Sequence, residues 1–237
     1  MKILLISGTN HKGSTYHIGR ILVNELGAKE DEVKEVFLPK DMPKYCCGCA
    51  RCFMEDEAKC PHYAYMKPIT DSIDEADVLI FTSPVYVYHV TGQMKSLLDH
   101  YGYRWMVHRP SEKMFSKQAV CISTAAGGGM KSTNKDIKDS LKFWGVGRIL
   151  TYGKGVAAIS WDGVSDKKKK SIEITIKQIA KKIKKREKNV KPSLKVKMMF
   201  YIMRLMEKRG GFNPVDYEYW KAKGWLEKKR PWKNSNN

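Results

Sequence analysis

Residues 2–15, KILLISGTNHKGST, decide the fold that we expect for this chain. Lys2–Ser7 is a short apolar run typical of a buried strand, and a loop rich in Gly, Ser and Thr follows it. Apolar side chains then recur with helical spacing at Ile18, Leu22 and Leu26. The order strand, loop, helix is typical of the first unit of an α/β protein.

Four more strands are predicted further along the chain. They cover Val33–Leu38, Ala76–Thr82, Ala119–Thr124 and Ile149–Val156. Helical patterns separate most of these strands, including those of residues 92–100 and 132–143. Strands that alternate with helices form a parallel sheet covered on both faces by right-handed crossovers. We therefore expect an α/β fold built on a doubly wound, five-stranded parallel sheet.

The chain continues beyond the fifth strand with two more helical patterns and an aromatic end. Isoleucines from Ile172 to Ile183 recur at helical spacing in a Lys-rich background, and Pro192 interrupts that pattern. Residues 193–208 predict a second, apolar-rich helix, and three tryptophans follow at Trp220, Trp225 and Trp232. We expect one domain over residues 1–190 and a helical, aromatic C-terminal extension over residues 191–237.

Most of the net charge of +19 belongs to this end of the chain. Residues 167–237 hold 23 Lys and Arg against 6 Asp and Glu, which leaves residues 1–166 close to neutral. A near-neutral body suits a small-molecule ligand, and a cationic arm suits an anionic surface. The alternative is a Lys-rich face that only keeps the protein in solution. No RNA-binding aromatic motif accompanies the charge, so we expect no nucleic-acid partner.

The same survey finds no membrane span or export signal. No apolar stretch approaches the roughly 20 residues that a spanning helix needs. The N-terminus carries a single Lys before a short apolar run, unlike a signal peptide. We expect a cytoplasmic protein.

The loop from Gly8 to Thr15 has the chemistry of an anion site. Its hydroxyls and backbone N–H groups lie where a helix starts, and helix N-termini attract phosphate. It mimics a P-loop, but Ser14 stands where that loop has Lys. The dinucleotide fingerprint also fails, because Asn10 replaces its second Gly. A monophosphate remains, which FMN presents, and a capped loop without a ligand is the alternative.

Two more loops are expected at the same edge of the sheet. Residues 83–88 follow the third strand and residues 123–129 follow the fourth, and the carboxyl ends of parallel strands meet at one edge. Val85 to Val87 can offer backbone groups to the polar edge of a flat ring, and Tyr86 can lie against its face. The glycine triplet lets backbone approach closely. The three loops together predict a flat, phosphorylated cofactor.

The stretches GTNHKGST, SPVYVYHVTGQMKSLLD and STAAGGGMKST resemble the NAD(P)H-dependent FMN reductase and iron-sulfur flavoprotein branch of the flavodoxin-like superfamily, over residues 2 to about 160. The resemblance implies the strand order 2-1-3-4-5, one FMN, NAD(P)H as electron donor, and a homodimer or higher homo-oligomer. The family often has Ser-Pro-Arg where this chain has Thr9-Asn10-His11, so we expect either that His11 reaches the phosphate differently or that Lys12 substitutes for the arginine. The implied FMN contacts are Thr9, His11, Gly13, Ser14 and Thr15 for the phosphate, and Pro84, Val85, Tyr86, Val87, Thr124, Ala125, Gly127 and Gly128 for the ring.

Five of the six cysteines lie in a short segment. Without an export signal, such clustering favours metal or redox use over disulfides. The spacing, similar to the iron-sulfur flavoprotein motif but with a longer last gap, places candidate ligands at Cys46, Cys49, Cys52 and Cys60. A [4Fe-4S] cluster, a structural zinc ion and free thiols near the flavin remain as alternatives.

Residues 101–110, YGYRWMVHRP, are rich in aromatic and cationic side chains. They predict either a nicotinamide pocket, with His108 or Arg109 near the 2′-phosphate of NADPH, or an interface between subunits.

The function that we expect is that of an FMN-dependent oxidoreductase. It takes electrons from NAD(P)H and passes them to a small acceptor such as a quinone, a flavin or a nitro compound. No side chain is expected to be catalytic, because the hydride passes directly to FMN. The alternative is an iron-sulfur flavoprotein that carries electrons to a protein partner. For the extension we expect packing across a partner subunit beside the flavin pocket, or docking on anionic lipid.

Overall fold

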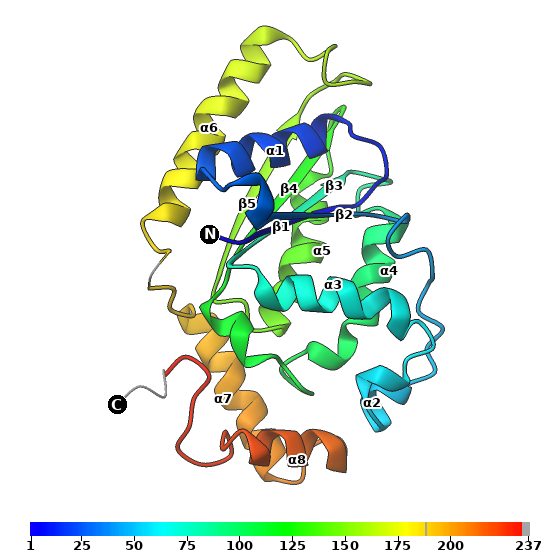
Figure 1. Ribbon diagram of the computed structural model, residues 1–237, viewed down its shortest axis with the longest axis vertical. Helices are drawn as coiled ribbons and strands as arrows, with labels where there is room; N and C mark the ends of the chain where they lie inside the picture. Colours follow the sequence, from blue (N-terminus) through cyan, green and yellow to red (C-terminus); the bar gives the residue numbers. More distant parts are fainter. Residues whose placement is uncertain (188, 234–237) are drawn as a thin grey trace.

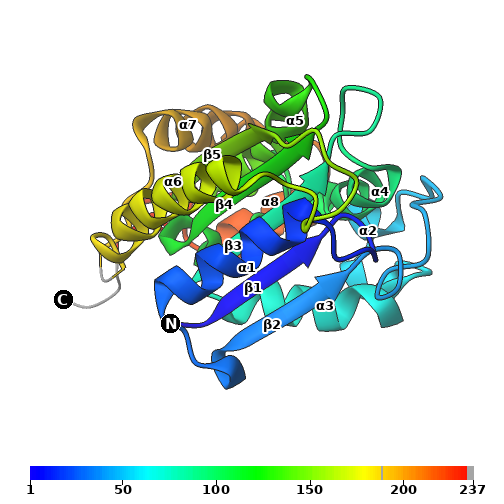
Figure 2. The same ribbon diagram turned by 90° about the horizontal axis from the view of Figure 1, so that it is seen from above.

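The computed structural model describes residues 1–187 and 189–233. At its centre is a five-stranded parallel sheet with the strand order β2-β1-β3-β4-β5 (Figure 2). The fold class and the strand order expected from the sequence are confirmed. The strands are β1 (Ile3–Ser7), β2 (Val33–Phe37), β3 (Val78–Pro84), β4 (Gln118–Ala125) and β5 (Arg148–Gly155).

Helices cover both faces of this sheet. In Figure 1, α1 and α6 lie on one face and α3, α4 and α5 on the other. Short 3₁₀ turns cover Glu30–Glu32, Glu57–Lys59, Gly102–Arg104 and Glu112–Ser116. The α-helices are α1 (Ser14–Leu26), α2 (Arg51–Met54), α3 (Tyr63–Glu75), α4 (Gly92–His100), α5 (Met130–Phe143), α6 (Asp166–Lys184), α7 (Leu194–Lys208) and α8 (Pro214–Ala222).

The two faces of the sheet form two apolar cores. Along β1, Ile3 and Leu5 pack toward α1 and α6, whereas Leu4 and Ile6 pack toward the helices of the opposite face. Strands buried on both faces carry continuous apolar runs, because successive side chains point to opposite sides. All four strand pairings are parallel, so the strands run in the same direction. Their carboxyl ends meet at one edge of the sheet.

Two helices differ from the sequence expectation. Helix α3 was not predicted, because Pro68 lies inside it and proline removes a helical hydrogen bond. Burial of Met66, Ile69 and Ile73 against the sheet outweighs that local cost. Helix α8 is also new. Pro214 occupies its first turn, and the side chain of Asn213 caps it by accepting from the N–H of Asp216 at 2.9 Å.

The C-terminal helices pack against the body of the same chain. Phe200 of α7 stacks on Trp220 of α8, with ring centroids 4.9 Å apart. Both rings belong to a buried cluster with Met106 and Phe115, which precede β4. Figure 1 shows α7 and α8 at the lower end of the molecule. Part of the apolar surface that we expected to meet a partner subunit is thus covered by the chain itself.

Among the helices of residues 1–187 and 189–233, none combines the length and the apolar character that a bilayer span requires.

Glu207 is an unusual feature of this C-terminal packing. Its side chain is fully buried near the end of α7, and neither carboxylate oxygen has a hydrogen-bond partner among the described residues. Burial, followed by the charge of Asp216, raises the pKa of Glu207 to about 7. The folded protein therefore holds the Glu207 proton between the ordinary pKa of 4.5 and about 7. The contribution of Glu207 to the free energy of unfolding therefore decreases as the pH rises through that window.

We predict that Glu207→Gln stabilises the protein above neutral pH, because the variant has no buried carboxylate to ionise. Its melting temperature, followed by circular dichroism, should exceed that of the wild type by several degrees at about pH 8. The difference should be much smaller at about pH 5. The exposed Glu218→Gln is the control and should shift the melting temperature little at either pH. A Glu207→Gln effect that is independent of pH would contradict the ionisation account.

Candidate functional site

The first loop leads from β1 into the N-terminus of α1. Gly13 directly precedes the helix, and the ring of His11 lies close above it. A Cβ atom at Gly13 would lie only 2.9 Å from Nδ1 of His11. The His11 ring therefore fits at this position because Gly13 has no side chain. The first turn of α1 contains no acidic residue. The first N–H groups of a helix lack intrahelical partners and carry partial positive charge, so this loop is suited to an anion.

The hydroxyls of α1 add a second feature of an anion site. The Oγ atom of Ser14 is buried and has no hydrogen-bond partner among the described residues. The Oγ1 atom of Thr15 lies 2.5 Å from Oγ1 of Thr124, which joins the first loop to the end of β4. A buried hydroxyl without a partner costs free energy, and a phosphate oxygen in the cavity would satisfy it.

The second loop begins with a tight turn that is built without glycine. Tyr86 and His89 exchange two backbone hydrogen bonds, of 2.9 and 3.0 Å. Val87 and Tyr88 between them have φ angles of 47° and 66°, which is the left-handed region. That region is unfavourable for a β-branched side chain such as valine. Strained backbone of this kind gathers at ligand sites, where the surrounding structure holds it in place.

The third loop packs tightly against the second. Gly129 has a φ angle of 92°, and a Cβ atom there would lie 2.6 Å from Cγ1 of Val85. Only glycine therefore allows the start of α5 to approach so closely. The N–H of Val85 also donates to the carbonyl of Thr124 at 2.9 Å. These contacts hold the loops after β3 and β4 in one fixed arrangement.

A cavity of about 290 Å³ lies between the three loops. The predicted residues Val87, Gly127 and Gly128 do not line it, and the side chain of Val87 is 94% exposed. The cavity is also lined by Tyr16, Ala126 and three residues after β5, which no sequence signal indicated. The predicted residues that do line it are Thr9, His11, Gly13, Ser14, Thr15, Pro84, Val85, Tyr86, Thr124 and Ala125.

A larger cavity, of about 930 Å³, lies between α8 and residues 103–116. None of the predicted FMN contacts lines this second cavity. The residues predicted to bind a phosphate therefore line the smaller cavity, at the carboxyl edge of the sheet.

The cysteine segment, residues 46–60, follows β2 in the chain, and Figure 2 shows it in light blue beyond the carboxyl end of that strand. The thiols of Cys46 and Cys49 are exposed, whereas those of Cys52 and Cys60 are partly buried. Burial, followed by the nearby thiols of Cys60, Cys46 and Cys49, raises the pKa of Cys52 to about 11. Burial is also the main cause that raises the pKa of Cys60, and the thiols of Cys49, Cys46 and Cys47 raise it further. Among the described residues, the group of three or more possible metal ligands that lie close together contains Cys60 but not Cys46, Cys49 or Cys52.

The raised pKa values of Cys52 and Cys60 bear on metal binding. A thiol with a raised pKa stays protonated on its own, and it becomes a thiolate when a metal ion or cluster compensates its charge. The buried Cys121 in β4 is different, because burial alone dominates and raises its pKa to about 12. It is a core residue of the sheet.

Two histidines next to Cys60 were missed by the sequence analysis. Nδ1 of His62 lies 2.9 Å from Nε2 of His100, and with Sγ of Cys60 these ligand atoms all lie within 4.8 Å of one another. Nδ1 of His100 lies 2.8 Å from the carbonyl oxygen of Ser96, the usual arrangement of a metal-binding histidine. A Cys-His-His set is suited to zinc. No spacing rule connects His100 with the cysteine run.

Arg109 joins the cysteine segment to the C-terminal helices. Its guanidinium donates to the carbonyl of Phe53 at 3.1 Å, to the carbonyl of Cys52, and to the carboxylate of Asp216 at 2.5 Å. Nδ1 of His108 lies 2.6 Å from the other oxygen of the same carboxylate, which is fully buried. Residues 108 and 109, considered above for a nicotinamide pocket or an interface, thus have partners within the chain.

A flavodoxin-like sheet with a phosphate loop at its carboxyl edge defines a class of flavin-binding proteins. Residues 1–160 match the NADPH-dependent FMN reductase family. The chain belongs to this family of oxidoreductases.

Relatives and solved structures agree with this assignment. An iron-sulfur flavoprotein of Archaeoglobus fulgidus is 28% identical over 231 residues, which is 95% of this chain and 100% of the relative. An iron-sulfur flavoprotein of Methanocaldococcus jannaschii is 29% identical over 58% of this chain and 69% of its own length. The azoreductase of Bacillus anthracis superposes with a TM-score of 0.55, with 15% identity, over 77% of this chain and 98% of its own. The last comparison shows the fold alone.

We predict that Arg109→Lys loosens the cysteine segment. Lysine keeps the positive charge beside Asp216 but lacks the fork that reaches two carbonyls and a carboxylate together. In metal-free protein, amide hydrogen exchange in residues 50–55 should become at least about tenfold faster than in the wild type.

The control is Glu112→Gln, which removes an exposed ion pair of 3.6 Å between Glu112 and Lys223 of the C-terminal extension. This variant should exchange like the wild type. Unchanged exchange in Arg109→Lys would show that Arg109 does not hold the cysteine segment.

Proposed function

We propose that the protein is an FMN-dependent oxidoreductase that takes electrons from NAD(P)H and passes them to a small acceptor such as a quinone, a flavin or a nitro compound. The observation that supports it most is the buried hydroxyl of Ser14, which has no partner among the described residues and lines the cavity at the start of α1. A helix N-terminus with an unsatisfied hydroxyl is suited to the phosphate of FMN.

The first loop would bind that phosphate. Ser14 and Thr15 offer hydroxyls, and Thr9 and His11 line the same cavity. The contact between Thr15 and Thr124 fixes the phosphate end of the cavity relative to β4. Gly13 leaves room for His11 above the helix start. The anion would thus be held by a preformed set of donors, which costs little conformational entropy on binding.

The second and third loops would orient the isoalloxazine ring. Pro84, Val85 and Tyr86 line the cavity together with Thr124 and Ala125. Val87, Gly127 and Gly128 do not line the cavity, and we propose that they contact the ring once FMN is bound. FMN itself supplies the chemistry, because it accepts a hydride and releases electrons singly or in pairs.

A second function is favoured by the cysteine segment. We propose that Cys46, Cys49, Cys52 and Cys60 hold a [4Fe-4S] cluster and that the protein carries electrons to a protein partner. Cys46 and Cys49 contribute to the raised pKa of both Cys52 and Cys60, which supports this proposal. The relative that matches nearly the whole chain is named an iron-sulfur flavoprotein.

We also propose a cytoplasmic location and a homodimer. The reducing cytoplasm would keep the exposed Cys46, Cys47 and Cys49 as thiols or as metal ligands rather than as disulfides.

The phosphate site predicts the effect of Ser14→Asp. A carboxylate at the start of α1 would repel the phosphate of FMN, so the variant should lose flavin on desalting while its far-UV circular dichroism stays unchanged. The control is Ser193→Asp, which places the same carboxylate at the N-terminus of α7, where Ser193 already caps the helix. This control should keep its flavin. Retention of flavin by Ser14→Asp would overturn the phosphate site.

The cysteine site predicts iron and acid-labile sulfide. Protein purified without air should contain about four of each per chain, and Cys52→Ala should contain much less. Cys121→Ala is the control, because Cys121 lies in the sheet, and it should keep its iron. Zinc in place of iron, lost in His100→Ala, would assign the metal to the Cys-His-His set instead.

A further inference from the structure

Helix α7 has a second apolar face that is largely exposed, although Arg230 and Trp232 of the same chain contact its Tyr201. Its inner face, with Val196 and Phe200, is buried in the aromatic cluster described above. The opposite face consists of Leu194, Met198, Tyr201, Ile202 and Leu205, which we call the outer stripe. Their side chains are 84%, 59%, 47%, 48% and 52% exposed. A continuous apolar patch of this kind marks a binding surface rather than ordinary surface scatter.

The spacing of the outer stripe keeps it in one line along the helix. Residues 194, 198, 201 and 205 are separated by four, three and four positions, so they follow one side of α7 over its length. Glu207, on the inner face, is buried instead. An apolar stripe on each of two opposite faces is more than a helix needs to pack on its own domain.

The charges around the outer stripe have one sign. Between residues 189 and 213 the chain has six cations, whereas Glu207 is the single acidic residue and is buried. Two copies that met through α7 would bring Lys195 and Lys208 against equal charges, without an exposed carboxylate from this stretch to compensate them. The surface is therefore unsuited to a second copy and suited to an anionic partner.

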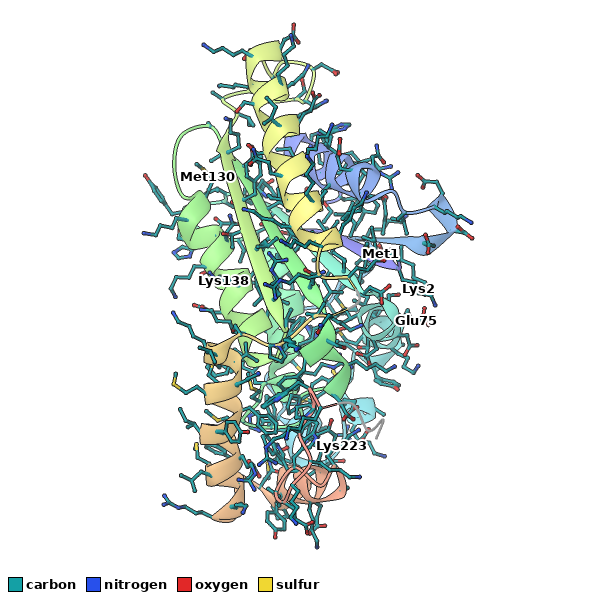
Figure 3. All side chains as sticks on the ribbon, turned by 90° about the vertical axis from the view of Figure 1, so that its left-hand side faces the viewer. Met1, Lys2, Glu75, Met130, Lys138 and Lys223 are labelled. Carbon is teal, nitrogen blue, oxygen red and sulfur yellow. The ribbon has the colours of Figure 1, made fainter. Side chains whose placement is uncertain are left out.

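The basic surface continues along α6. Figure 3 shows α6, in yellow, above α7, in orange, on the side of the molecule that faces the viewer. Exposed lysines of α6 include Lys170, Lys177 and Lys181, which outnumber the exposed Glu173 among them, and Ile174 is 62% exposed. The two helices have lengths of about 28 and 22 Å at 1.5 Å per residue. Such a long cationic side suits an extended anionic surface better than the compact patch of a small acidic protein.

We propose that the outer stripe of α7 docks this protein on the surface of an anionic lipid bilayer. The apolar side chains of the stripe enter the boundary between headgroups and acyl chains, while the lysines beside them contact the anionic headgroups. Nucleic acid offers the same negative charge but no apolar phase to receive five large side chains. The proposal is independent of the flavin function, since it uses no residue of the cavity.

The test is flotation of the full-length, flavin-loaded protein with vesicles. Binding is expected to vesicles of phosphatidylcholine and phosphatidylglycerol in equal parts, and not to vesicles of phosphatidylcholine alone. The double variant Met198→Glu/Leu205→Glu should bind at least about tenfold more weakly, because it places carboxylates where the helix meets the lipid. Both side chains are exposed, so the fold should tolerate the change.

The matched control is Tyr65→Glu, which places a carboxylate on a residue of α3 that is 41% exposed and belongs neither to α6 nor to α7. It should bind like the wild type. Failure of the wild type to float with anionic vesicles would overturn the proposal. The outer stripe would then be assigned to an acidic protein partner. Equal binding of the double variant and the wild type would overturn it as well, because binding would then come from charge alone.

Discussion

The parallel pairing of β1 with β3 and of β3 with β4 is the constraint on which the site depends. Because these strands run in the same direction, the loops after residues 7, 84 and 125 meet at one edge. The pairing extends to Pro84 opposite Thr124, so the second and third loops start from fixed positions in the sheet. A rigid sheet edge explains how backbone as strained as that of Val87 can persist.

A buried carboxylate plays a comparable part for the C-terminal helices. Asp216 joins α8 to Arg109, and Arg109 in turn holds the carbonyls of the cysteine segment. The extension is therefore linked through Arg109 to the cysteine segment that is proposed to bind metal. A second buried carboxylate, that of Glu207 in α7, has no hydrogen-bond partner among the described residues. With its inner face used in this way, α7 keeps only the outer stripe for a partner.

The sequence predicted what depends on local pattern. The five strands, the bounds Gly92–His100 of α4 and ten residues of the cavity follow from apolar runs, loop composition and family resemblance. The turn at Val87 and Tyr88 was not predictable, because it lacks the glycine or asparagine that signals positive φ. The bond between Arg109 and Asp216 was not predictable either, because 107 residues separate them. Such contacts are set by tertiary packing, which no short window of sequence contains.

The central claim, that the three loops hold FMN for electron transfer from NAD(P)H, is tested most directly by a visible absorption spectrum. The protein should be purified without air and desalted, and its spectrum recorded before and after addition of NADPH and of NADH. The account predicts flavin bands that bleach with at least one of the two donors, above a broad iron-sulfur absorbance. A spectrum without flavin bands, in protein that also fails to take up added FMN, would contradict it.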